Sequence, residues 1–387
     1  MNRTTTNGTG NSDRRRIVVA MSGGVDSSVA AALLVAQGHE VIGMMMRLWS
    51  ESGAGIDAPT NRCCTPDQMA DARRVADRLG IPFYVIDVRQ HFRQAIVQFF
   101  IDEHEAGRTP NPCVECNRQI RFTYLLERAM ALGADYLATG HYARVAATDD
   151  GYQLLQGVDA NKDQSYVLHT LRQDQLARVL FPIGEYTKSE VRELAQQQGL
   201  LVASKQESQD LCFLKDGDYR RFLRENSIQI QTPGPILDES GRELGHHEGL
   251  PFYTIGQRKG LGIAAAEPLF VLRKDPARNA LIVGPREALG VRELAATGVN
   301  WISGAVPADP ISAQVRIRYK AVGIEATVSP LGSGQAHVLF AEPVFGVTPG
   351  QAAVFYDGEV CLGGGLITGG QTLETVAESG RAEELVA

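Results

Sequence analysis

The first half of the chain alternates short apolar runs with longer segments whose apolar residues recur at helical spacing. The runs predict strands at residues 17–21, 40–47, 83–88 and 136–139, and the segments between them predict helices at residues 29–37, 66–79, 91–104 and 117–132. Strands that alternate with helices indicate an α/β fold with a mostly parallel, doubly wound sheet. Ligands of such sheets bind beyond the carboxyl ends of the strands.

Local signals mark the helix starts. Thr65-Pro66-Asp67-Gln68 and Thr187-Lys188-Ser189-Glu190 each place a threonine three residues before Gln or Glu, which is the pattern of a capping box. The first of them also has proline at the first helical position. Asn117 is expected to cap the helix that ends before Gly133.

After about residue 216 the pattern changes to short apolar stretches separated by proline and glycine. Residues 314–320 alternate polar and apolar side chains, which predicts a strand with Arg316, Arg318 and Lys320 on one face. This basic stripe fits RNA binding, and it fits a solvated strand face equally well. We therefore expect a small β-rich connector followed by a β-barrel.

The 387 residues are too many for one ordinary core, so two or three folded units are expected. The pattern divides the chain into a flexible tail, an α/β domain, a β-rich connector, a C-terminal β-barrel and a second tail, at residues 1–14, 15–216, 217–295, 296–372 and 373–387. No apolar run reaches the roughly 20 residues that a membrane helix needs. No apolar signal-peptide core follows the polar first sixteen residues, so a cytoplasmic protein is expected, with an organelle address as the alternative.

The net charge is −7, which argues against a nonspecific nucleic-acid coat and leaves room for a local basic surface.

The glycine-rich segment Ser22–Ser28 joins the first predicted strand to the first predicted helix. A turn of this kind directs backbone N–H groups and the helix N-terminus at one spot, which suits a phosphate group. The segment is not the G-x-x-x-x-G-K-[ST] phosphate loop, because it has no lysine. A Gly-Gly pair alone could be a plain tight turn, but the full Ser-Gly-Gly-x-Asp-Ser string resembles the pyrophosphate loop of enzymes that split ATP between its α- and β-phosphates.

The chain has six cysteines, and without a secretory signal a structural disulfide framework is not expected. Cys113 and Cys116 form a C-x-x-C just before the predicted helix start, where the helix dipole favours a reactive thiolate; an incidental turn is the alternative. Cys212 alone fits a buried core position as well as a catalytic one. The adjacent pair Cys63-Cys64 and the strand residue Cys361 are expected to be structural.

Several strings, in order from about Arg16 to Gly369, resemble the bacterial tRNA-specific 2-thiouridylase (MnmA) family. They are Ser22–Ser28, Gly107–Pro112, Thr139–Tyr142, Asn161–Tyr166, Glu207–Phe213, Gly245–Leu250, Tyr253–Gly262 and Thr348–Gln351. The resemblance implies that the α/β domain uses ATP and Mg²⁺ to adenylate the C2 oxygen of the wobble uridine of certain tRNAs. Sulfur then replaces that oxygen, and AMP leaves.

The resemblance also assigns roles to residues at matching positions. The ATP site would be formed by Ala20, Met21, Ser22, Gly23, Gly24, Val25, Asp26, Ser27, Met46 and Gly140. Cys212 would carry persulfide sulfur, and Cys116 would be the nucleophile that resolves the product through a transient disulfide bond. A cysteine desulfurase or a sulfur-relay protein is the expected sulfur donor.

The tRNA, bound through its anticodon arm, would contact Asn111, Pro112, Cys113, His141, Lys162, Asp163, Gln164, Arg318, Tyr319 and Gln351. The target base must be flipped out or already unpaired to react at C2. His141 could equally be a structural histidine.

The chain departs from the family at Cys113, where many members have an aspartate that is a candidate general base. Cys113, Cys116 and Cys212 instead resemble the three-cysteine site of related thiolation enzymes that hold a 4Fe–4S cluster, which raises a cluster as a hypothesis beside the persulfide. Two other readings remain, a small-molecule ATP pyrophosphatase and a non-catalytic RNA-binding protein. The first predicts ATP turnover without tRNA, and the second predicts tRNA binding without AMP release.

Overall fold

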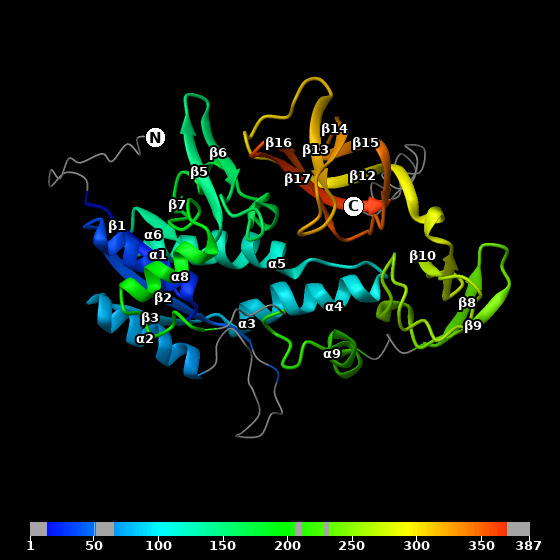
Figure 1. Ribbon diagram of the computed structural model, residues 1–387, viewed down its shortest axis with the longest axis horizontal. Helices are drawn as coiled ribbons and strands as arrows, with labels where there is room; N and C mark the ends of the chain where they lie inside the picture. The colour runs from blue at the N-terminus through cyan, green and yellow to red at the C-terminus, as the bar shows by residue number, and fades with distance from the viewer. Residues whose placement is uncertain (1–13, 50, 52–65, 206–210, 228–231, 370–387) are drawn as a thin grey trace.

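The computed structural model describes residues 14–49, 51, 66–205, 211–227 and 232–369, so the expected N-terminal tail up to residue 13 and the tail after residue 372 lie outside the described residues. The N-terminal unit contains a parallel sheet in the order β3-β2-β1-β4-β7 (Figure 1). Its strands are β1 (Arg16–Ala20), β2 (Glu40–Arg47), β3 (Phe83–Asp87), β4 (Tyr136–Ala138) and β7 (Val179–Leu180). The predicted parallel α/β sheet is confirmed.

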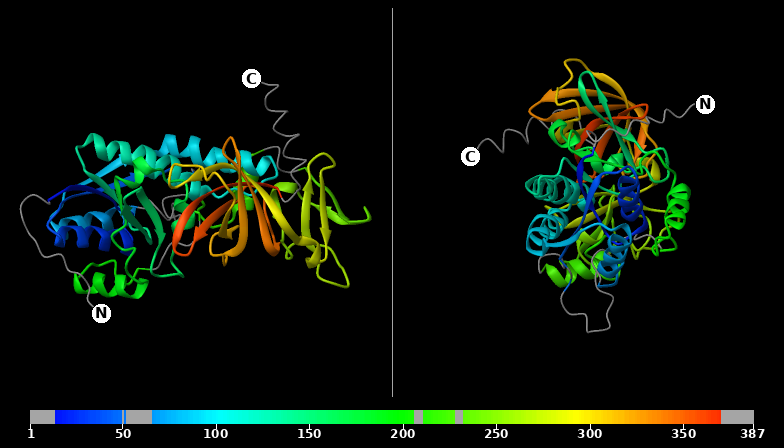
Figure 2. Two further views of the ribbon diagram at one scale, coloured as in Figure 1. Left: turned by 90° about the horizontal axis from the view of Figure 1, so that it is seen from above. Right: turned by 90° about the vertical axis from the view of Figure 1, so that its left-hand side faces the viewer.

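Helices cover both faces of this sheet, because alternate strand residues point to opposite sides. Ile17 and Val19 of β1 pack in one cluster with helix α1, while Val18 packs in another with Phe122 and Leu125. Figure 2 shows helices on either side of the strands. The first face carries α1 (Val25–Ala36), α2 (Pro66–Leu79) and α8 (Lys188–Gln197). The other face carries the continuous helices α3-η1-α4 (Arg89–Phe92, Arg93–Val97, Gln98–Glu105) and α5-η2-α6 (Pro112–Glu115, Cys116–Leu125, Leu126–Ala131).

One predicted helix start is wrong. Asn117 does not cap a helix; it lies inside one, buried, with its amide donating to the carbonyl of Val167. The helix begins at Pro112, because the Asn111 side chain accepts hydrogen bonds from the backbone N–H groups of Cys113 and Val114. The C-x-x-C therefore lies within the first turns of the helix. The predicted capping box of Thr187 and Glu190 is confirmed, whereas Thr65 lies outside the described residues.

The C-terminal unit is a closed antiparallel barrel in the order β12-β15-β14-β13-β16-β17, closed by pairing of β12 with β17. Its strands are β12 (Gly290–Trp301), β13 (Ile311–Arg316), β14 (Ile324–Gly332), β15 (Gln335–Phe345), β16 (Ala352–Asp357) and β17 (Val360–Gly369). The expected division between residues 295 and 296 falls inside β12, whose first residue, Gly290, already pairs with Phe345. The hairpin β5 (Ala143–Thr148) and β6 (Gly151–Gln156) extends from the α/β unit and pairs with β17, so one sheet joins the two units.

The predicted basic stripe on β13 is wrong. The strand ends at Arg316, and Lys320 has a positive φ of 66°, which breaks the alternation. Arg316 points inward, where it forms an ion pair of 2.8 Å with buried Asp163 and lies over the ring of Tyr356. Of the three predicted basic residues, Arg318 and Lys320 are exposed.

A four-stranded sheet, β10-β11-β8-β9, forms the middle unit after helix α9 (Tyr219–Asn226). Its strands are β8 (Gly234–Asp238), β9 (Glu243–His247), β10 (Phe270–Asp275) and β11 (Ala280–Gly284). Phe92 and Phe100 of the α/β unit share one hydrophobic cluster with Phe222 and Phe252, so this unit is fused to the end of α4 (Figure 1). Short elements complete the fold: α7 (Gln173–Leu176), η3 (Ser165–Leu168), η4 (Leu250–Phe252) and η5 (Arg286–Leu289).

Within the described ranges, every helix is too short or too polar to span a membrane.

Candidate functional site

The glycine-rich loop follows β1 and opens helix α1, as predicted. Gly24 is the N-cap, and as a glycine it has no side chain to bond the N–H groups of the first helical turn. The serines brace the loop: the Ser28 hydroxyl donates to the Gly24 carbonyl at 2.7 Å, and the Ser27 hydroxyl accepts from the backbone N–H of Ser22 at 3.2 Å. This preformed turn with a 12-residue helix behind it can hold a phosphate chain.

Two glycines are required by close backbone contacts. Gly23 has a φ of 71°, and a Cβ there would lie 2.2 Å from the carbonyl oxygen of Gln68 in α2. Gly140, just beyond β4, lies so close to α1 that a Cβ would be 2.6 Å from the nitrogen of Ser27. The turns after β1 and β4 therefore meet at the carboxyl edge of the sheet, where ligands of this fold class bind. Met46 lies near the same edge, next to the last residue of β2.

Two lysines that the sequence reasoning missed converge on this loop. Lys188, at the start of α8, bonds to both carboxylate oxygens of Asp26 at 2.7 and 2.9 Å. Tyr142 donates its hydroxyl to the same carboxylate at 2.8 Å. Lys205 donates to the carbonyl of Gly23 at 3.0 Å and pairs with Asp71. The loop itself lacks a lysine, but the fold brings in two from residues more than 160 positions away.

The cysteines differ in exposure. Cys113 is exposed in the first turn of the helix, Cys116 is 5% exposed, and Cys212 is half-buried. Cys116 belongs to the hydrophobic cluster of Phe92, Ile96 and Phe213, and Cys212 packs against the same cluster, although the two residues are nearly a hundred positions apart in sequence. The helix becomes π-helical at Cys116, a geometry often found at functional sites.

The remaining cysteines divide between structure and the undescribed part of the chain. Cys361 is fully buried in β17, and burial raises the pKa of its thiol to about 12, so it is protonated and fills the core. Cys63 and Cys64 lie outside the described residues. Among the described residues, no disulfide joins Cys113, Cys116, Cys212 and Cys361 to one another.

The described His, Cys, Asp and Glu side chains include no group of three or more that could hold a metal ion. Because Cys113, Cys116 and Cys212 are all among them, the arrangement does not fit the cluster-ligand hypothesis.

The loop before the C-x-x-C lies against the barrel. Thr109 donates its backbone N–H to Pro349 at 2.9 Å and accepts from the side-chain amide of Gln351 at 2.8 Å. A Cβ at Gly350, whose φ is 91°, would lie 2.9 Å from the nitrogen of Thr109. Two motifs separated by about 240 residues thus form one surface, which leads to Asn111 and Pro112.

Several candidate tRNA contacts are already engaged within the protein. His141 is buried between Phe122 and Phe181 and bonds through Nδ1 to the Thr139 hydroxyl at 2.6 Å. Burial and then nearby Arg121 lower the pKa of His141 to about 3, so its ring is neutral near pH 7.

The motif at residues 161–166 has a similar structural core. Buried Asp163 accepts from the backbone N–H groups of Gly157 and Ser165 and pairs with Arg316. Gln164 accepts from the backbone of Tyr142, while Lys162 is half-exposed. Tyr319 is half-buried, with its ring 6.1 Å from that of Tyr166. The accessible charged candidates are therefore Lys162 and Arg318.

Comparisons with known proteins cover nearly the whole described chain. The family model described as tRNA methyl transferase HUP domain matches residues 15–216. The models for the tRNA methyl transferase PRC-barrel domain and the aminomethyltransferase beta-barrel domain match residues 220–285 and 291–367. These three matches correspond to the parallel-sheet unit, the middle unit and the closed barrel.

About half of the aligned residues are identical in curated relatives named tRNA-specific 2-thiouridylase MnmA. The protein from Magnetococcus marinus is 52% identical over 354 residues, which cover 91% of this chain and 99% of the relative. The protein from Chloroflexus aggregans is 52% identical, covering 91% of this chain and 98% of its own length. The protein from Geobacter metallireducens is 51% identical, with 93% and 98% covered. The chain belongs to the tRNA-specific 2-thiouridylase family.

Proposed function

We propose that this protein replaces the C2 oxygen of the wobble uridine, position 34 of tRNA, with sulfur in an ATP-dependent reaction. One observation carries the proposal: a pyrophosphate-type loop and two thiols, Cys116 and Cys212, occur in one α/β unit, with the two thiols at one hydrophobic cluster. A phosphate loop prepares an oxygen to leave, and a thiol delivers the sulfur that replaces it. The descriptions of the family models refer to methyl transfer, but this pairing fits thiolation.

ATP would be held by the loop residues Ala20–Ser27, with Met46 and Gly140 beside the adenosine and Mg²⁺ near the phosphates. When bound, it supplies an AMP group to the uridine O2, which turns a poor leaving group into a good one. The N–H groups at the start of α1 would bind the phosphates. Lys188 and Lys205 would add positive charge beside them.

The thiols would act in sequence, with Cys212 carrying a persulfide. Its terminal sulfur attacks C2 of the activated uridine and AMP leaves. The thiolate of Cys116 then attacks Sγ of Cys212, which breaks the S–S bond, releases the 2-thiouridine and forms a Cys116–Cys212 disulfide. An external dithiol must reduce that disulfide before the next turnover, and a cysteine desulfurase or relay protein supplies the sulfur. The persulfide route is proposed in place of a cluster because the three cysteines form no metal-binding group.

The tRNA would bind with its anticodon arm against the α/β unit and the barrel, in the cytoplasm. Asn111, Pro112 and Cys113 would border the target base, and the surface that Thr109 forms with Gln351 would support that loop. Lys162 and Arg318 would contact phosphates. His141, Asp163, Gln164 and Tyr319 would act mainly by shaping the surface, since their side chains are engaged internally.

The test is mass spectrometry of nucleosides from a tRNA transcript incubated with iron-free protein, ATP, Mg²⁺, cysteine and a desulfurase. We expect 2-thiouridine at position 34, AMP in equal amount, and neither product with the Cys212→Ser variant beyond background AMP. AMP formation that is independent of tRNA would instead favour a small-molecule pyrophosphatase. Thiolation that requires added iron and sulfide would restore the cluster hypothesis.

A further inference from the structure

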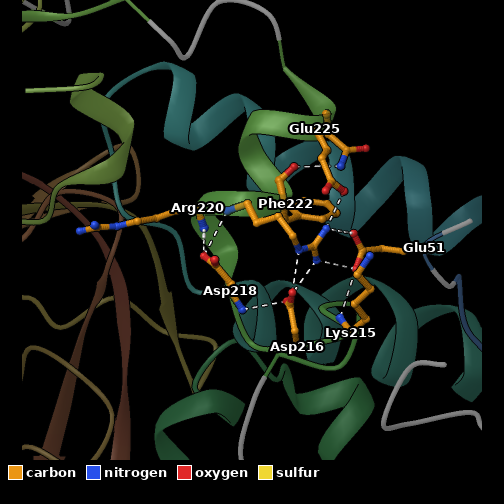
Figure 3. Close-up of polar contacts among 9 residues, drawn as sticks. Glu51, Lys215, Asp216, Asp218, Arg220, Phe222 and Glu225 are labelled. Atoms are coloured by element: carbon orange, nitrogen blue, oxygen red, sulfur yellow. Dashed lines mark hydrogen bonds and ion pairs between the residues drawn. The ribbon is translucent and has the colours of Figure 1, made fainter. Parts of the chain in front are cut away.

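Arg221, near the start of α9, binds three carboxylates at once. Its Nε and Nη2 donate to the two oxygens of Asp216 at 2.7 and 3.1 Å. Its Nη1 and Nη2 donate to the two oxygens of Glu51 at 3.0 and 2.9 Å, and Nη1 also donates to Glu225 at 2.5 Å. All five N–H donors of the guanidinium are therefore used. Figure 3 shows Glu51, Asp216 and Glu225 gathered around one point while Arg220 extends away from them.

The three carboxylates come from different parts of the chain. Glu51 lies beyond β2, at the carboxyl edge of the parallel sheet, and Asp216 lies four residues after Cys212. Glu51 also accepts the backbone N–H of Lys215 at 3.1 Å. Arg221 and Glu51 together tie the backbone just after Cys212 both to helix α9 and to the edge of the nucleotide-binding sheet.

The centre of this network is shielded from solvent. The side chains of Arg221 and Glu51 are 20% and 9% exposed, whereas the outer partners Asp216 and Glu225 are 42% and 52% exposed. Arg224 of the same helix is 41% exposed and pairs with Glu248, which is 72% exposed. Hydrogen bonds to Asp216 and Glu51 raise the pKa of Arg221, and Arg221 lowers the pKa of Asp216 to about 2. Two bidentate contacts to one guanidinium fix its orientation as well as pair its charge.

The same backbone is anchored by a buried ring next to Cys212. Leu214 donates its N–H to the carbonyl of Leu211, so Cys212 lies in a tight turn. Phe213 is 1% exposed and contacts the rings of Phe92, Phe100 and Phe222. Phe213 and the Arg221 network thus hold the backbone on the C-terminal side of Cys212 at two successive points.

We propose that Arg221 is a positioning residue for sulfur transfer, which holds the Cys212 turn in register with Cys116 through Glu51, Lys215 and Asp216. The inference rests on the proposed function, because it assigns Cys212 the transferred sulfur. A misplacement of about 1 Å at a reacting centre can cost about 100-fold in rate, so a clamp this close to the thiol affects the transfer step. Among the described residues, the hydrogen bonds of Glu51, Asp216 and Arg221 do not reach the glycine-rich loop, so we expect adenylation to be much less affected than sulfur transfer.

The experiment compares Arg221→Gln with Glu225→Gln as a matched control, because Glu225 is an exposed partner of Arg221 that is not connected to the Cys212 segment. Three quantities are measured on the full chain. They are tRNA-dependent exchange of labelled pyrophosphate into ATP, single-turnover thiolation by persulfide-loaded enzyme, and the rate at which iodoacetamide labels Cys212, read by peptide mass spectrometry.

For Arg221→Gln we expect pyrophosphate exchange within about twofold of wild type, thiolation at least about tenfold slower, and a changed rate of Cys212 labelling. Glu225→Gln should match wild type in all three quantities. The values for Arg221→Lys should lie between those of wild type and Arg221→Gln, because lysine keeps the charge without the bidentate contacts. Equal losses in exchange and thiolation, or no loss in either, would overturn the proposal. If Arg221→Gln does not fold, Glu51→Gln tests the same link. If wild-type enzyme makes no 2-thiouridine, the proposed function fails, and the labelling rate alone still tests the positioning.

Discussion

In the proposed reaction the glycine-rich loop binds the nucleotide and the Cys212 turn carries the sulfur, and the two are built in different ways. The loop is seven consecutive residues whose glycines and hydroxyls fix its shape within one strand–helix junction. The Cys212 turn is held by side chains of helix α9, which follows it closely in sequence, and by the distant residues Phe92, Phe100 and Glu51. The shape of the loop, the nucleotide half, is therefore encoded mostly locally, although Lys188 and Lys205 reach it from distant segments. The Cys212 turn, the sulfur half, depends more on tertiary contacts.

This difference has a functional explanation. A phosphate loop must present rigid N–H groups before ATP arrives, and preorganised donors act without reorganisation when charge develops. A thiol that accepts sulfur from a partner and then delivers it to an RNA base must meet two different reactants. Because the loop and the Cys212 turn are held by different contacts, the two halves should respond to different mutations.

The largest effect that we expect comes from Gly23→Ala. The added Cβ would lie 2.2 Å from the backbone carbonyl of Gln68, at a φ of 71°, so the loop must move. We expect tRNA-dependent AMP formation to fall more than about 100-fold, while desulfurase-dependent persulfide formation on Cys212 stays within about twofold. Gly38→Ala is the matched control, because Gly38 has a φ of 85° and no atom within 4 Å of the added Cβ. Loss of both activities in Gly23→Ala would contradict the division into two halves.

A smaller effect on the same half is expected from Lys188→Met. The substitution leaves Asp26 without its lysine partner at the start of α1 and removes a cation beside the loop. We expect kcat/KM for ATP to fall by about 10- to 100-fold, a loss typical of one charged group in a phosphate site. Lys205→Met should cost less, because Lys205 bonds to a loop carbonyl and its charge is paired with Asp71. An unchanged kcat/KM in Lys188→Met would show that this lysine only neutralises Asp26.

The sequence predicted the parts of the molecule that depend on near neighbours. The strands around the first sheet, the start of α2 at Pro66 and the capping box at Thr187 follow from local periodicity and capping chemistry. The junction of strand, Gly-rich turn and helix was found for the same reason.

The errors arise where a tertiary contact overrides a local pattern. The alternation at residues 314–320 predicted a longer strand, but Arg316 turns inward to buried Asp163, 153 residues away. Asn117 has good capping chemistry, yet Asn111 with Pro112 starts the helix one turn and a half earlier. Lys188, Lys205 and Arg221 could not be assigned to the site, because their partners Asp26, Gly23 and Glu51 are more than 160 residues away and no local motif marks them.

Acidification should lower the free energy of unfolding through buried His104, which lies in the hydrophobic surroundings of the sulfur half. This ring lies against Phe100 and stacks on Tyr219, and burial, followed by nearby Lys274, lowers its pKa to about 3. Below pH 6.5 His104 is protonated in the unfolded chain but stays neutral in the folded protein. The free energy of unfolding therefore falls as the pH drops from 6.5 towards 3. At pH 5 the cost is about 2 kcal/mol from this ring.

The measurement is urea unfolding at pH 7.5 and 5.0 in a Trp301→Phe background, which leaves Trp49, packed on Phe222, as the only tryptophan. His104→Gln should reduce the acid-induced loss by up to about 2 kcal/mol, whereas exposed His246→Gln should not. An equal loss in all three proteins would show that other groups dominate.

A stability effect of the opposite sign, a gain, is expected at the junction beside Gly107. Lys274 of β10 lies beside Gly107, and in the described chain its buried ammonium nitrogen has no hydrogen-bond partner. Burial lowers the pKa of Lys274 to about 8, so the folded protein bears the full cost of the charge below pH 8, and that cost disappears as pH rises towards 10.5. Lys274→Met should therefore raise the free energy of unfolding at pH 7 by about 1–3 kcal/mol, and by less at pH 10.

Urea unfolding followed by Trp49 fluorescence measures this gain, with exposed Lys259→Met as the control that should show none. A loss of stability in Lys274→Met at pH 7 would mean that the ammonium is satisfied by bound water or an anion. A higher free energy of unfolding would show that the unpaired ammonium group of Lys274 destabilises the native protein.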